Sequence, residues 1–195
     1  MQDRIFGDRE KAMEEAYFRQ EDAKLLKKLN EKAQLDEIAL ALGEKLQVDN
    51  PDLLMRVREA GVSLDTAPAL FLGPLIQVAW AGGSVTKAEH HAVLRLARGR
   101  GIDPASPAYA QVEEWLKHRP DDKLFETAVE VIKYGLAVLP HYEQEERIKR
   151  VVEACREVAK ASGSKISWVL GLFDGINSSE ASALDAITKK LRRPR

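Results

Sequence analysis

The sequence contains a single cysteine and few aromatic residues. One cysteine, Cys155, among 195 residues cannot form an internal disulfide, which excludes the disulfide-rich folds of small secreted proteins. Cys155 lies in the segment VVEACREVAK, where its position on an amphipathic helix is typical of a small buried side chain rather than a nucleophile. Because structural disulfides are rare in the cytosol, we expect a cytoplasmic protein.

The chain also lacks an excess of either charge and lacks a long apolar run. Its 30 Lys and Arg against 31 Asp and Glu leave a formal net charge of −1. Such a balance gives no general attraction to nucleic acid or to anionic lipid. The longest apolar run, residues 67–81, is shorter than a typical membrane-spanning helix, and residues 1–10 lack the apolar segment of a signal peptide. We expect no nucleic-acid partner and no membrane span, and we interpret residues 67–81 as a buried core helix.

The apolar residues that are present recur at helical spacing. No segment shows sustained alternation of apolar and polar residues, so the sequence predicts an all-α fold. Pro51, preceded by Asn50 or Asp49 as the capping residue, is typical of a helix start, and Gly61 of a helix end. Residues 122–139 and 143–161 carry strong amphipathic patterns and are predicted helices.

Four segments are expected along the chain. Residues 1–47 form a charged helical extension with a narrow apolar stripe, which buries too little surface to fold alone. We therefore expect this extension to contact a protein partner, a second copy of the chain or the main domain. Residues 48–64 form a short helix and linker, residues 65–191 the main helical domain, and residues 192–195 a basic tail.

Two turns in the main domain share one pattern. The segments GGSVTKAE (residues 82–89) and DGINSSE (residues 174–180) each contain a glycine, a β-branched apolar residue, a capping residue and a Glu three positions after the cap. In a capping box this Glu accepts a hydrogen bond from the backbone N–H of the cap and suits the positive end of the helix dipole. We interpret Glu89 and Glu180 first as capping residues. We expect the two turns to lie near each other or to be related by approximate two-fold symmetry.

These residues also carry a family resemblance. The segments PLIQVAWAGGSVTKAEHHAVLRLARGRGI and GLFDGINSSEASALDAITKKL resemble the two halves of the TerB-like family of tellurite-resistance and stress-response proteins, over about residues 65–191. The resemblance implies a compact helical bundle built of two similar halves. It also implies a non-enzymatic binding or scaffolding module that acts in the stress response.

The same resemblance implies binding of a divalent metal ion, such as Ca²⁺ or Mg²⁺, by acidic residues at helix starts. The corresponding residues here are Glu89, Asp174 and Glu180. This chain departs from the family at Gly82, where the first half should carry an Asp. Because a hard cation needs several oxygen ligands, we expect weak binding, mainly through Asp174 and Glu180.

A second resemblance and two alternative functions remain. The segment FGDREKAMEEAYFRQEDAKLLKKL is similar in a general way to the small helical inhibitor subunits of bacterial ATP synthases, which implies an interaction helix. A structural protein that dimerises through this helix is one alternative function. An enzyme of unrecognised type, with a pocket between the two halves, is another, although the sequence contains no P-loop, nucleophile elbow or dinucleotide-binding glycine motif. Zinc binding by His90 and His91 is disfavoured because consecutive helical residues point about 100° apart.

Overall fold

A computed structural model describes residues 20–25, 27, 42–163 and 176–193, and every regular element among them is a helix. The prediction of an all-α fold is therefore confirmed for the described part of the chain. The chain divides into two units, residues 1–41 and 42–195. In the first unit, residues 20–25 and 27 are helical, and Lys24 Nζ lies 2.9 Å from a carboxylate oxygen of Glu21. The rest of this unit lies outside the described residues.

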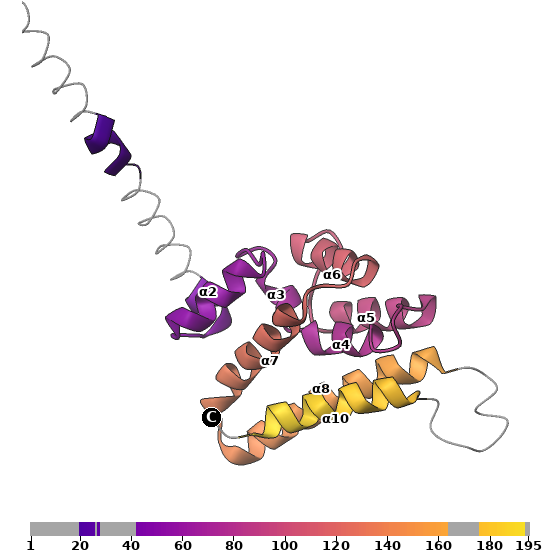
Figure 1. Ribbon diagram of the computed structural model, residues 1–195. Helices are drawn as coiled ribbons and strands as arrows, with labels where there is room; N and C mark the ends of the chain where they lie inside the picture. Colours follow the sequence, from indigo (N-terminus) through magenta and orange to yellow (C-terminus); the bar gives the residue numbers. More distant parts are fainter. Residues whose placement is uncertain (1–19, 26, 28–41, 164–175, 194–195) are drawn as a thin grey trace, which may run out of the picture. The chain divides into compact units, whose positions relative to one another are not determined.

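The second unit is a set of packed helices (Figure 1). They are α2 (Pro51–Glu59), α3 (Ala67–Leu70), α4 (Gly73–Ala79), α5 (Lys87–Gly99), α6 (Pro107–Lys117), α7 (Asp122–Ala137), α8 (His141–Ser162) and α10 (Ser178–Arg192). A further helical segment covers residues 42–46. Helices α8 and α10 run antiparallel and side by side, and α4 and α5 both pack on α8. Helix α7 contacts α2, α4 and α10.

Local sequence signals account for most of the helix limits. Asn50 Oδ1 accepts a hydrogen bond from the Leu53 N–H at 3.0 Å, and Pro51 begins α2. Gly61, just after α2, has a φ of 75°, a conformation that glycine adopts without the steric cost of a side chain. The predicted start and end of this helix are therefore confirmed.

The interpretation of residues 67–81 as a single buried helix is wrong. Two short helices, α3 and α4, occupy this segment, with a break at Phe71 and Leu72. Pro74 has no N–H to donate to the preceding turn, and proline is well tolerated in the first turn of a helix, so α4 begins there anew. A Cβ at Gly73 would lie 2.4 Å from the Ala128 Cβ, so a glycine allows α4 to approach α7 closely.

The apolar core extends beyond the expected main domain. Leu42, Leu46 and Val48 are 0%, 3% and 3% exposed and join the same buried cluster as Phe125. The boundary between the two units therefore falls within the segment expected from sequence to be the extension. Cys155 is fully buried in this cluster, as predicted, and burial raises the pKa of its thiol to about 12.

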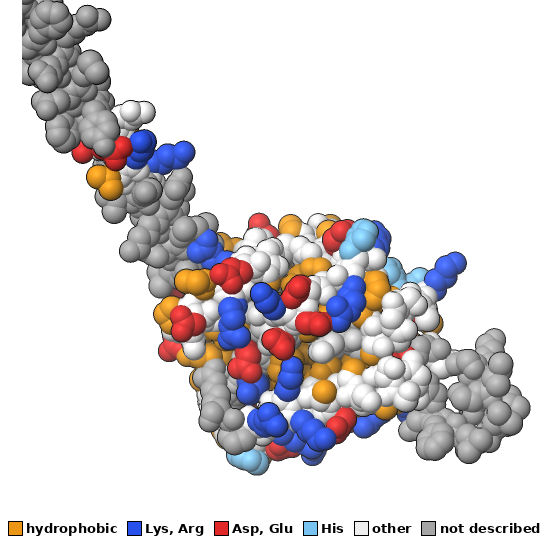
Figure 2. Space-filling view, in the orientation of Figure 1, with side chains coloured by type: hydrophobic (Ala, Val, Ile, Leu, Met, Phe, Trp, Pro, Cys, Tyr) orange, Lys and Arg blue, Asp and Glu red, His pale blue; other side chains and the backbone are white. Residues whose placement is uncertain are grey.

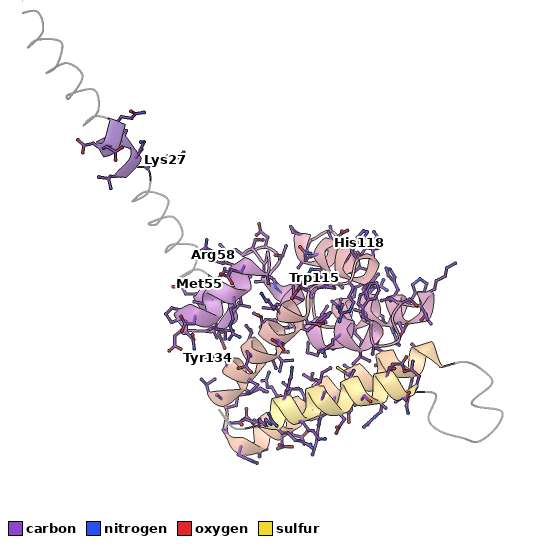
Figure 3. All side chains as sticks on the ribbon, in the orientation of Figure 1. Lys27, Met55, Arg58, Trp115, His118 and Tyr134 are labelled. Atoms are coloured by element: carbon purple, nitrogen blue, oxygen red, sulfur yellow. The ribbon has the colours of Figure 1, made fainter. Side chains whose placement is uncertain are left out.

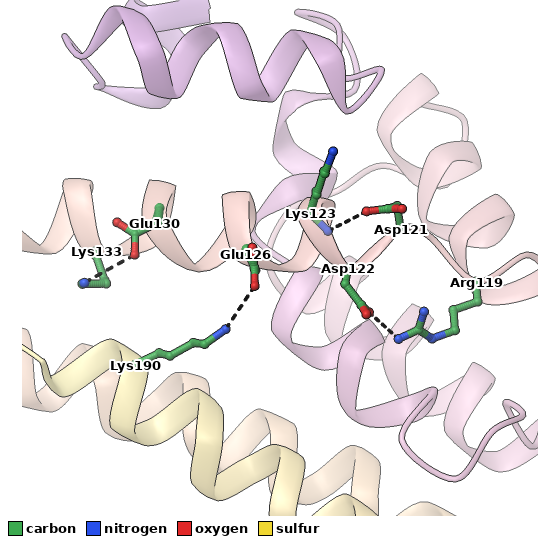
Figure 4. A network of polar contacts seen from close by, with 8 residues as sticks. All are labelled: Arg119, Asp121, Asp122, Lys123, Glu126, Glu130, Lys133 and Lys190. Atoms are coloured by element: carbon green, nitrogen blue, oxygen red, sulfur yellow. Dashed lines mark hydrogen bonds and ion pairs between the residues drawn. The ribbon is translucent and has the colours of Figure 1, made fainter.

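Polar contacts connect helices that are distant in sequence. The indole Nε1 of Trp80, at the end of α4, donates to the backbone carbonyl of Trp115 in α6 at 2.8 Å. On the surface, Lys190 of α10 lies 3.9 Å from a carboxylate oxygen of Glu126 of α7 (Figure 4). The first contact is partly shielded and fixes the approach of α6, whereas the second is solvent-exposed and contributes little to stability.

The surface carries charges of both signs. Figure 2 shows acidic and basic side chains interspersed over one face, in keeping with the balanced net charge. Isolated apolar side chains are also exposed, among them Met55 of α2 at 57% (Figure 3). Within the described segments, none of the helices combines the length and apolar character needed to cross a bilayer.

Candidate functional site

The first capped turn precedes α5. Thr86 Oγ1 accepts a hydrogen bond from the Glu89 N–H at 3.2 Å, and the Thr86 N–H donates to Glu89 Oε2 at 2.7 Å. This reciprocal pair confirms the predicted capping box. Glu89 is only 1% exposed, and Val85 is half-buried against the core. The turn therefore holds a carboxylate inside the protein at the start of a helix.

The second capped turn precedes α10 and contains one more hydrogen bond. Asn177 Oδ1 accepts from the Glu180 N–H at 2.9 Å, and the Asn177 N–H donates to Glu180 Oε2 at 3.1 Å. The Asn177 side-chain Nδ2 also donates to Glu180 Oε1, at 2.5 Å. Glu180 is 1% exposed, and Ile176 is half-buried like Val85. Both oxygens of Glu180 thus accept a hydrogen bond from the cap.

The two turns lie next to each other. A Cβ built at Gly82, in the first turn, would lie 3.6 Å from Asn177 Nδ2 in the second. Burial raises the pKa of Glu89, and the negative charge of Glu180 raises it further, whereas the hydrogen bonds from Thr86 lower it. The expectation that the turns are neighbours is therefore confirmed. That the main domain is built of two similar halves stays a prediction.

The junction of these turns has the right donor chemistry for a hard cation but an incomplete donor set. Calcium takes about six to eight oxygen ligands and magnesium about six. In the described part of the junction, the two carboxylates are those of Glu89 and Glu180, and no group of three or more His, Cys, Asp or Glu suited to a metal occurs among the described residues. Asp174, the remaining predicted ligand, lies outside them. The predicted metal site stays a prediction.

Two surface cavities within the second unit had no signal in the sequence. One, of about 480 Å³, lies between α8 and α10 and is lined by charges of both signs, including Glu153, Arg156 and Asp185. The other, of about 370 Å³, is lined by Lys45, Arg100 and two arginines of α8. Their charged residues come from separate segments or from ordinary solvated helix faces, so no local motif marks either cavity.

Comparison with protein-family models, with curated proteins and with solved structures finds no match to this chain. The TerB-like resemblance of residues 65–191 and the general likeness of residues 6–29 to inhibitor helices therefore remain predictions from the sequence. What the structure adds is the geometry of the two capped turns and of the cavities.

Proposed function

We propose that this protein is a non-enzymatic binding module of the TerB-like, stress-response type, and that the junction of its two capped turns binds a divalent cation weakly. The observation that supports this proposal most is the meeting of two buried carboxylates from distant segments, Glu89 and Glu180. The stress-response role rests on the sequence resemblance of residues 65–191.

A cation at this junction has a clear electrostatic rationale. Two buried carboxylates of like charge repel each other, and burial together with the charge of Glu180 raises the pKa of Glu89. A divalent ion would replace that repulsion by attraction. Glu89 would be the first ligand, because none of the described residues donates a hydrogen bond to its Oε1, whereas both oxygens of Glu180 already accept from Asn177. Asp174, the first residue of the second turn in the sequence, would add a third carboxylate.

The enzyme alternative has less support. Among the described groups, the pKa is raised for Glu89 and Cys155 and lowered for Arg100. Cys155 is fully buried with a raised pKa, which is the opposite of an activated thiolate. Glu89 uses one oxygen in its cap, and Arg100 keeps its charge at neutral pH and suits anion binding rather than proton transfer.

Ion titration of the full chain tests this function. Adding CaCl₂ or MgCl₂ at millimolar concentration should raise the melting temperature, because a ligand that binds only the folded state stabilises it. Glu89→Gln should abolish the rise, since Gln can keep the capping box but carries no charge. Glu59→Gln, which removes an exposed carboxylate on α2, is the matched control and should behave as the wild type. An unchanged melting temperature with both ions would reject the cation site.

The cellular role needs a separate experiment. A strain that lacks this protein should be more sensitive to tellurite or to oxidative stress, and the wild-type protein should restore resistance. Restoration by Glu89→Gln to the same level would separate the stress-response role from ion binding. Equal survival with and without the protein would contradict the stress-response role.

A further inference from the structure

Four cationic side chains converge on the cavity of about 370 Å³ in the second unit. Lys45 comes from the helical segment at residues 42–46, Arg100 from the end of α5, and Arg147 and Arg150 from successive turns of α8. Among the described residues, no Asp or Glu lines this cavity. It therefore presents positive charge alone, unlike the cavity between α8 and α10, where both signs occur.

These four cations lack the partners that their neighbours have. On the same helix, Lys149 pairs with Glu146 at 3.1 Å, and Glu145 lies 3.3 Å from Arg192 of α10. Within the described segments, the side chains of the four cavity cations form no hydrogen bond or ion pair. Grouped like charges without a counter-charge repel one another, so an anion placed among them gains from all four.

Apart from Gln47, the rest of the cavity lining is apolar. Phe71, at the break between α3 and α4, is 38% exposed and lines it, and Ile132 and Leu136 of α7 form part of its wall at 8% and 7% exposure. The volume lies within the range of about 300–1,000 Å³ that is usual for small-molecule sites. A charged rim above an apolar wall suits a ligand with one anionic end and one apolar end.

A glycine in a helix leaves this space open. Gly135, near the end of α7, lines the cavity, and a Cβ built on it meets no atom within 4 Å. Glycine inside a helix costs about 1 kcal/mol relative to alanine, so its presence here is not explained by the stability of α7. A larger side chain at this position would occupy the cavity without a clash at its Cβ.

We propose that this cavity binds a small amphipathic anion, with a carboxylate or phosphate head among the four cations and an apolar chain against Phe71 and Leu136. Arg147 and Arg150 would donate to the head, because guanidinium groups match the geometry of carboxylate and phosphate oxygens. This site is separate from the junction of the capped turns and carries the opposite charge, so it does not depend on cation binding there.

Calorimetric titration of the full chain at low salt tests the proposal. Octanoate and octyl phosphate are the probes, octanol is the neutral control, and acetate tests the head without the chain. We expect at least one of the two octyl anions to bind, with a Kd that weakens as NaCl is added, because salt screens the exposed cations. Octanol and acetate should bind at least about tenfold more weakly, since each lacks one of the two complementary ends.

Matched variants separate the site from general surface charge. Arg147→Gln and Arg150→Gln should each weaken anion binding about tenfold, which is the usual cost of a lost charged hydrogen bond. Arg156→Gln, on the same helix but at the other cavity, should not. Gly135→Leu should abolish binding while the melting temperature is kept or raised. Failure of both octyl anions to bind, equal binding of octanol, or equal effects of Arg147→Gln and Arg156→Gln would each overturn the proposal.

Discussion

The two capped turns have the same capping box but leave their carboxylates in different states. The backbone N–H of Thr86 donates to Oε2 of Glu89, and the hydrogen bonds from Thr86 lower the pKa of that carboxyl group. Asn177 offers a backbone donor and a side-chain donor, so both oxygens of Glu180 accept. The identity of the cap thus decides how much of the buried carboxylate remains available. The same local pattern can give one saturated carboxylate and one that can still bind.

The two turns should differ most in the loss of stability that follows removal of the capping side chain. Asn177→Ala should lower the free energy of unfolding by about 3 kcal/mol, because the Glu180 N–H loses its acceptor and the Glu180 carboxylate loses the hydrogen bond from Asn177 Nδ2. Thr86→Ala removes the acceptor of the Glu89 N–H and the side-chain hydrogen bond of Thr86 to Glu89, and should cost about 1 kcal/mol. Urea denaturation of both variants measures the difference. Equal losses would show that the extra hydrogen bond from Asn177 is not important.

Substitution of each glutamate by glutamine should also lower the free energy of unfolding by unequal amounts. In Glu180→Gln, one of the two donors of Asn177 would face the new NH₂ group, at a cost of about 2 kcal/mol. Rotating the Asn177 amide would not help, because Oδ1 would then leave the Glu180 N–H. Glu89→Gln keeps its one acceptor and should cost less than about 1 kcal/mol. Chemical denaturation at pH 7 is the measurement, and a larger loss in Glu89→Gln would reverse the assignment.

A carboxylate added at Gly82, where the TerB-like family that the sequence resembles has an Asp, should strengthen calcium binding at the junction of the capped turns. A Cβ at Gly82 meets only Asn177 Nδ2, at an ordinary contact distance of 3.6 Å, so Gly82→Asp should fold normally. The added carboxylate should raise calcium affinity about tenfold, since affinity follows the number of charged ligands. Gly82→Asn, which is similar in size but neutral, is the control. Equal affinities in the two variants would mean that the junction holds no ion.

The pH dependence of the free energy of unfolding should show the raised pKa of Glu89. Its pKa in the folded protein is raised above the ordinary value of 4.5, so the folded state retains this proton at a pH where the unfolded state has lost it. The contribution of Glu89 to the free energy of unfolding should therefore fall as the pH rises through the window just above 4.5. Subtracting the curve of Glu89→Gln from that of the wild type isolates this fall. A difference curve that rises over the same window would contradict the raised pKa.

Local sequence signals predicted most of the helix limits and both capping boxes of the candidate cation site. The caps at Asn50, Thr86 and Asn177 were predicted because each depends on residues within one helical turn. The break between α3 and α4 was missed because the apolar pattern continues through it, and Pro74 was not taken as a helix start. The different numbers of hydrogen bonds to the two glutamates were also missed. The capping-box pattern accepts Thr and Asn equally, and it does not show that the Asn side chain can donate a further hydrogen bond.

The cationic cavity could not be predicted from local patterns. Lys45, Arg100 and Arg147 are far apart in sequence, and each occurs in a segment where an exposed basic residue is ordinary. Only the packing of α5, α7 and α8 places these side chains around one space. Gly135 gave no signal either, because a glycine inside a helical pattern does not show from the sequence alone which space it borders.

Glu89 itself gives the most direct test of whether the junction of the capped turns binds a cation. The measurement is a pH titration of the Glu89 side-chain carboxyl carbon by NMR, in the absence and in the presence of saturating calcium. Without calcium, the pKa of Glu89 should lie above 4.5, because the group is buried and close to Glu180. With calcium, it should fall, because a nearby positive charge favours the carboxylate. A Glu89 pKa that calcium leaves unchanged would contradict cation binding at the junction.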